Sequence, residues 1–60
     1  MKGFIEVTGK NEEGKILVNI RAIDSVYTYN GVTRILPINK PSFDVEETYD
    51  EVKTKIECVN

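Results

Sequence analysis

The sequence predicts an α+β fold: a curled antiparallel β-sheet of four to five strands, made of two hairpins and a short strand, followed by one C-terminal α-helix. Three observations predict it. The dipeptide Asn30-Gly31 separates two runs rich in β-branched and aromatic residues, which is the strongest short-range signal of a hairpin. An alternating apolar pattern before it predicts another hairpin. From Thr48 onward the apolar period becomes that of a helix.

The first expected hairpin joins a strand at residues 4–8 to a strand at residues 15–20. The polar stretch 9–14 between them reads as the loop. Because side chains alternate across a strand, one side of this hairpin carries a set of branched apolar residues, and the other side carries two bulky ones. The first set is Ile5, Val7, Ile16, Val18 and Ile20; the second is Phe4 and Leu17.

The second hairpin follows a short turn at residues 21–24. Asn and Gly adopt the positive φ angles that a two-residue type I′ turn requires, and such a turn fixes the register of its strands. The expected pairs are Tyr29 with Val32, Thr28 with Thr33, Tyr27 with Arg34, Val26 with Ile35, and Ser25 with Leu36. Since paired residues share a face, Val26 and Ile35 lie on one side and Tyr27, Tyr29 and Arg34 on the other.

The last part of the chain contains a break, a short strand and the helix. Pro37 and Pro41 bracket the break, because proline cannot donate to a sheet ladder, and residues 42–46 form the strand. Thr48 and Glu51 have the spacing of a capping box, in which each side chain accepts from an amide of the first turn. The apolar stripe of the helix is Tyr49, Val52, Ile56 and Val59.

Length and composition predict one small domain, residues 1–60, of marginal stability. The chain has one cysteine, Cys58, and no histidine, so neither a disulfide nor a structural zinc can reinforce it, and self-association remains. A net charge of −2 and a pI near 5.0 give no electrostatic footprint for nucleic acid or an anionic membrane. Neither a membrane span nor a signal peptide is evident, and we expect a cytoplasmic protein.

Candidate catalytic residues lack the partners that their chemistry needs. Cys58, Ser25 and Ser42 have no histidine to act as a base, and no glycine-rich phosphate loop precedes a helix. An acidic group surrounds the expected helix start, where carboxylates are favoured by the helix dipole alone: Asp44, Glu46, Glu47, Asp50 and Glu51. We therefore expect a non-enzymatic protein with no cofactor, no metal and no small-molecule substrate.

One surface remains as a candidate for function. A single helix can cover only the branched apolar side of the sheet, which leaves the opposite side with Phe4, Leu17, Tyr27, Tyr29, Val32, Arg34 and Leu36. Tyr, Phe and Arg are enriched in protein interfaces, so we expect contact with a second copy or with another protein. Two alternatives stay open. Strong curling of the sheet would make this face a second core, and tyrosines beside an arginine can stack nucleic-acid bases.

Three segments resemble the FlbD-type family of very small bacterial flagellar proteins and related short proteins. They are residues 5–8, the strand 16–19 with its continuation 20–26, and the closing 45–52 running to Ile56. The resemblance implies a cytoplasmic, non-enzymatic accessory or regulatory role. Where that family tends to place a glycine-centred turn, this chain has Pro37 and Pro41. The order of strands and final helix is also loosely similar to LytTR-type DNA-binding domains, which are longer and more basic.

Overall fold

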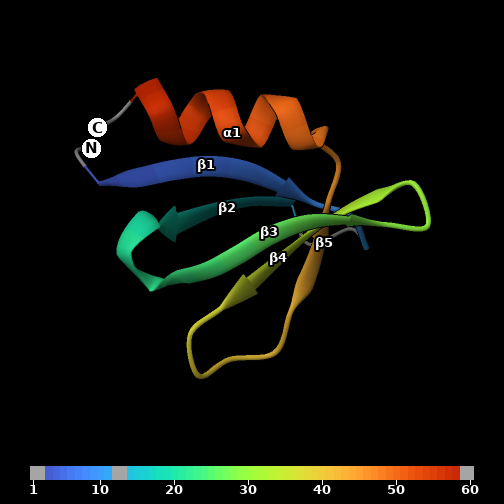
Figure 1. Ribbon diagram of the computed structural model, residues 1–60, viewed down its shortest axis with the longest axis horizontal. Helices are drawn as coiled ribbons and strands as arrows, with labels where there is room; N and C mark the ends of the chain where they lie inside the picture. Colours follow the sequence, from blue (N-terminus) through green and yellow to red (C-terminus); the bar gives the residue numbers. More distant parts are fainter. Residues whose placement is uncertain (1–2, 12–13, 59–60) are drawn as a thin grey trace.

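The computed structural model describes residues 3–11 and 14–58 and confirms the α+β fold. Five antiparallel strands precede one C-terminal helix (Figure 1). The elements are β1 (Phe4–Gly9), β2 (Gly14–Asn19), the 3₁₀ turn η1 (Ile20–Ala22), β3 (Ile23–Tyr29), β4 (Val32–Pro37), β5 (Phe43–Val45) and α1 (Tyr49–Cys58). Among the described residues, no helix combines the length and apolar character that crossing a membrane requires.

Both predicted hairpins form, and the second has the predicted register. Asn30 and Gly31 have φ angles of 52° and 77°, as a type I′ turn requires, and all five predicted pairs of β3 with β4 are present. Strand β4 runs one residue farther than expected: Pro37 pairs with Ile23 at its end, and the break follows it. The strand tolerates this proline because β5 pairs only with Thr33, Arg34 and Ile35 and does not reach Pro37.

The strand order β2-β1-β5-β4-β3 shows how the two hairpins are joined. Strand β5 lies between them and pairs through Val45 with Gly9 of β1 and with Thr33 of β4. Consequently the sheet curls without closing, and β2 and β3 are its two edges. The short turn η1, whose N-cap Asn19 accepts from the amide of Arg21 at 3.0 Å, connects these edges.

The core lies between the inner face of the sheet and the helix. Its buried apolar side chains are all valine or isoleucine: Ile5, Val7, Val18, Ile35, Val45 and Val52. Helix α1 packs against β1 and β3 (Figure 1). Thr48 and Glu51 form the predicted capping box, with bonds of 2.8 and 3.1 Å.

Two members of the expected helical stripe pack as predicted, since Val52 is buried and Ile56 lies against the core. Tyr49 is at the margin instead, with 43% of its surface exposed, because it starts the helix beside β3 rather than over the centre of the sheet. The fourth member, Val59, lies outside the described residues.

Candidate interaction surface

The tyrosine surface is the outer face of the β3–β4 hairpin, and we define it by Tyr27, Tyr29, Val32, Arg34 and Leu36. The register places these five side chains on the side of the sheet opposite Val26 and Ile35, which face the helix. Tyr29 is 52% exposed and Tyr27 38%, whereas the other three are half-buried. The tip of the hairpin projects past the first turn of α1 (Figure 1). Because the helix covers the opposite face of the sheet, the two rings are open to solvent on a two-stranded support.

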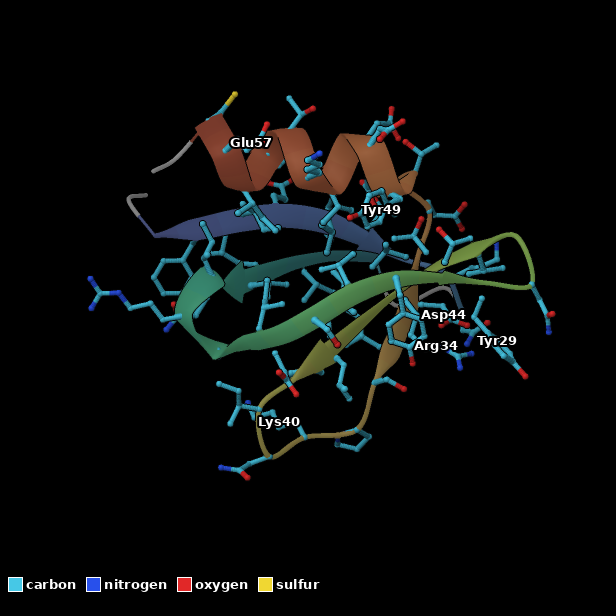
Figure 2. The ribbon with its side chains drawn as sticks, in the orientation of Figure 1. Tyr29, Arg34, Lys40, Asp44, Tyr49 and Glu57 are labelled. Carbon is cyan, nitrogen blue, oxygen red and sulfur yellow. The ribbon has the colours of Figure 1, made fainter. Side chains whose placement is uncertain are left out.

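The side chain of Arg34 lies between Tyr29 and Asp44 and contacts both. Its guanidinium carbon lies 4.7 Å from the centre of the Tyr29 ring, within the range of a cation–π contact. Its Nε donates to Asp44 Oδ1 at 2.7 Å, and one terminal nitrogen reaches Oδ2 at 3.4 Å. Figure 2 shows Tyr29, Arg34 and Asp44 gathered at one end of the sheet. Two-point pairing of this kind fixes the plane of the guanidinium as well as its position.

The electrostatics of this surface follow from that pair. The bond from Arg34 holds the pKa of Asp44 below its ordinary value, and the bond to Asp44 raises the pKa of Arg34. Both groups are therefore ionised at neutral pH and compensate each other. The tyrosine surface is consequently polar and aromatic with little net charge.

The pairing of Asp44 with Arg34 is not predicted by the sequence. The sequence groups Asp44 with the acidic residues at the helix start, whereas β5 places it directly opposite Arg34 of β4. A strand of three residues carries too little local pattern to show which strand it will join. The available signal was weak: an alternating segment after the prolines, with one acidic residue between Phe43 and Val45.

Phe4 and Leu17, the other two candidates, also lie on the outer side of the sheet. They belong to β1 and β2, beyond β5 in the strand order, and the curl of the sheet separates them from the tyrosine surface. Leu17 is 51% exposed, whereas Phe4 is half-buried. The structure therefore groups five of the seven candidates in one hairpin and places two on another.

Three of the acidic residues near the helix start, Asp44, Glu47 and Glu51, have separate partners. The carboxylate of Glu47 accepts from the amide of Thr8 at 2.9 and 3.1 Å and from its hydroxyl at 3.0 Å, while Glu51 completes the helix cap. Burial alone would raise the pKa of Glu47, but the bonds from Thr8, a bond from its own amide and the charge of Lys55 together outweigh burial, and the net shift is downward. Within residues 3–11 and 14–58, no three His, Cys, Asp or Glu side chains are grouped to hold a metal ion.

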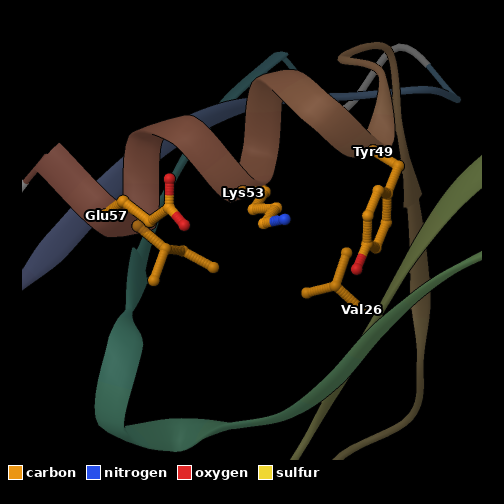
Figure 3. A pocket seen from close by; sticks show the side chains of 5 residues that line it. Val26, Tyr49, Lys53 and Glu57 are labelled. Atoms are coloured by element: carbon orange, nitrogen blue, oxygen red, sulfur yellow. The ribbon is translucent and has the colours of Figure 1, made fainter.

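A groove of about 290 Å³ lies between β3 and α1. Val26 and Tyr49 approach each other across it, and Lys53 and Glu57 project from the helix at its rim (Figure 3). Ile56 completes its lining. The groove opens where Tyr49 lies at the margin of the core, and it faces away from the tyrosine surface because Val26 is on the inner face of the sheet.

Comparison with known proteins gives no match to any family model, curated protein or solved structure.

Proposed function

We propose that this chain is a small, non-enzymatic protein-interaction module that associates through the outer face of its sheet, with a second copy as the expected partner. The observation that carries the proposal is the arrangement of the tyrosine surface. Two exposed rings lie on the β3–β4 hairpin, and the arginine beside them is already held by Asp44. An accessory or regulatory role in the cytoplasm, implied by the family resemblance, is part of the same proposal.

The energetics of association favour such a surface. Tyrosine offers a large contact area at the cost of ordering only two side-chain torsions, and Tyr and Arg are among the residues that most often dominate interface energies. Arg34 loses little further freedom on binding because Tyr29 and Asp44 already hold it. Preorganisation of this kind reduces the entropic cost of association.

The same contacts make nucleic acid the weaker candidate. A phosphate-binding arginine contributes through an uncompensated positive charge, and Arg34 shares its charge with Asp44. The exposed tyrosines could still stack bases, so a titration with single-stranded oligonucleotides at low salt separates the two functions. Electrostatic affinity is greatest at low salt, and we expect no binding there.

The proposal is tested by the solution mass of the wild-type chain. We expect sedimentation equilibrium at tens to hundreds of micromolar to give a mass above the 6.8 kDa of one chain, decreasing on dilution. A mass of one chain throughout this range would overturn self-association.

A further inference from the structure

The two free edges of the sheet differ in how well they are protected. Strand β3 has an irregular pairing between Ile23 and Ser25, next to the charged Asp24, and α1 packs beside it. Bulges, charges and covering helices are the features that prevent an edge from pairing with another chain. Strand β2, in contrast, pairs with β1 without a break in register from Gly14 to Asn19, and its one charged residue, Lys15, lies near the start of the strand.

One backbone hydrogen bond shows which residues of β2 bond to β1 and which direct their backbone groups away from it. The amide of Ile20 donates to the carbonyl of Gly3 at 2.9 Å, and this pair continues the register of the hairpin. Bonded and non-bonded pairs alternate along an antiparallel ladder. Leu17 and Glu6 therefore form a non-bonded pair, and the backbone N–H and C=O of Leu17 point away from β1. In the described part of the chain, no strand pairs with β2 on that side.

A hydrogen bond on the other side of β1 independently confirms this alternation. Thr8 and Lys15 also form a non-bonded pair, so the amide of Thr8 must point away from β2. That amide donates to the carboxylate of Glu47, on the other side of β1. The backbone groups of Lys15, Leu17 and Asn19 are therefore the ones presented at the free edge.

The side chains at this edge favour pairing with an identical strand. Leu17 is half exposed in the middle of the strand, and its neighbours on the same face of β2 are Lys15 and Asn19. In an antiparallel pair centred on Leu17, Lys15 of one chain lies opposite the partner's Asn19, so no like charges meet. On β3 the edge-directed backbone groups belong to Val26 and Thr28, whose side chains lie on the inner face. Pairing β2 with the partner's β3 would therefore join the outer face of one copy to the inner face of the other, whereas pairing β2 with β2 keeps the two outer faces continuous.

We propose that two copies of this chain pair through their β2 strands, antiparallel, about a two-fold axis at Leu17. Each Leu17 exchanges two backbone hydrogen bonds with the partner's Leu17, and the two side chains bury each other on the outer face. The sheets of the two copies become continuous. This mode of contact is β-strand addition with the second copy as the added strand.

This contact rests on the proposed self-association and adds a second interface to it. The β2 edge and the tyrosine surface lie on different hairpins. A chain with two different self-complementary interfaces joins its neighbours through each in turn, and the assembly then extends beyond a dimer. Removing either interface alone leaves dimers, and removing both leaves single chains.

Disulfide trapping tests the register directly. In a Cys58→Ser background, Leu17→Cys places two thiols on opposing residues about 5.5 Å apart between Cα atoms, within the range of a disulfide. Lys15→Cys is the matched control, because its two copies lie about 14 Å apart in the same pairing. We expect mild oxidation to link the first variant into covalent dimers and to leave the second unlinked. No linkage at position 17, or equal linkage at both positions, overturns the proposal.

Solution mass separates this contact from the tyrosine surface. In the Tyr27→Ser/Tyr29→Ser background we expect dimers, and adding the exposed substitution Leu17→Lys gives single chains that keep the wild-type circular dichroism. If Leu17→Cys does not cross-link and the mass still falls when the two tyrosines are replaced, the β2 contact is refuted and the tyrosine interface stands. If Leu17→Cys cross-links and Tyr27→Ser/Tyr29→Ser has the wild-type mass, the β2 contact is supported and the tyrosine interface is refuted.

Discussion

Arg34 of β4 and Asp44 of β5 form a hydrogen-bonded ion pair of 2.7 Å on the outer face of the sheet. The pair joins neighbouring strands and places the guanidinium beside Tyr29 at 4.7 Å. It fixes the one cationic side chain of the tyrosine surface without leaving that surface charged. The geometry of the proposed interface therefore depends on this pair.

Replacing Asp44 should release Arg34 and weaken association through the tyrosine surface while leaving the core intact. In Asp44→Asn the acceptor charge is lost, so we expect Arg34 to leave Tyr29 and the association to weaken severalfold. The measurement is the association constant from sedimentation, together with NMR shifts of the Tyr29 ring. Glu46→Gln is the control, because Glu46 is exposed and neighbours the same strand. Equal weakening by both variants would show that net charge, rather than the fixed arginine, is responsible.

Core and surface isoleucines should differ widely in their effect on stability. Ile35 is fully buried, so Ile35→Ala should lower the free energy of unfolding by about 2–5 kcal/mol. Ile38 is 50% exposed, and Ile38→Ala should change it by less than about 0.5 kcal/mol. Urea denaturation followed by circular dichroism measures both. Similar losses for the two variants would contradict the assignment of the core.

The helix cap gives a third prediction. Thr48→Ala removes the oxygen that accepts from the amide of Glu51, and the expected loss is about 0.5–2 kcal/mol in the free energy of unfolding. Thr54→Ala, on the exposed side of the same helix, is the control and should have little effect. Equal losses for the two threonines would mean that the capping box contributes nothing.

Acid should remove the stabilisation that the ionised Glu47 side chain gives to the fold. Its pKa is lowered in the folded state, so its stabilisation is present at pH values above its ordinary value of 4.5 and is lost as the pH falls through the folded value. The difference in melting temperature between wild type and Glu47→Gln should therefore shrink below about pH 4.5. The exposed Glu46→Gln serves as the reference at each pH. A difference that stays constant down to pH 2 would exclude an ionised Glu47 as the cause.

Local signals account for what could be predicted from the sequence. The Asn30-Gly31 turn fixed the register of five residue pairs, and the Thr48–Glu51 spacing located the helix start, because turns and caps depend on neighbouring residues. The position of β5 between β1 and β4 depends on contacts such as Gly9 with Val45, far apart in the chain. No periodicity within residues 43–45 encodes it. Hence the outer position of the tyrosines was predictable, and the Arg34–Asp44 pair was not.

The most direct test of the account is the solution mass of Tyr27→Ser/Tyr29→Ser compared with Tyr49→Ser. All three tyrosines are exposed, but only Tyr49 lies outside the tyrosine surface, on the helix. Circular dichroism first establishes that each variant retains the wild-type fold. The account predicts that the double variant has a lower mass than wild type at the same concentration and that Tyr49→Ser does not. A folded double variant with the wild-type mass would contradict it.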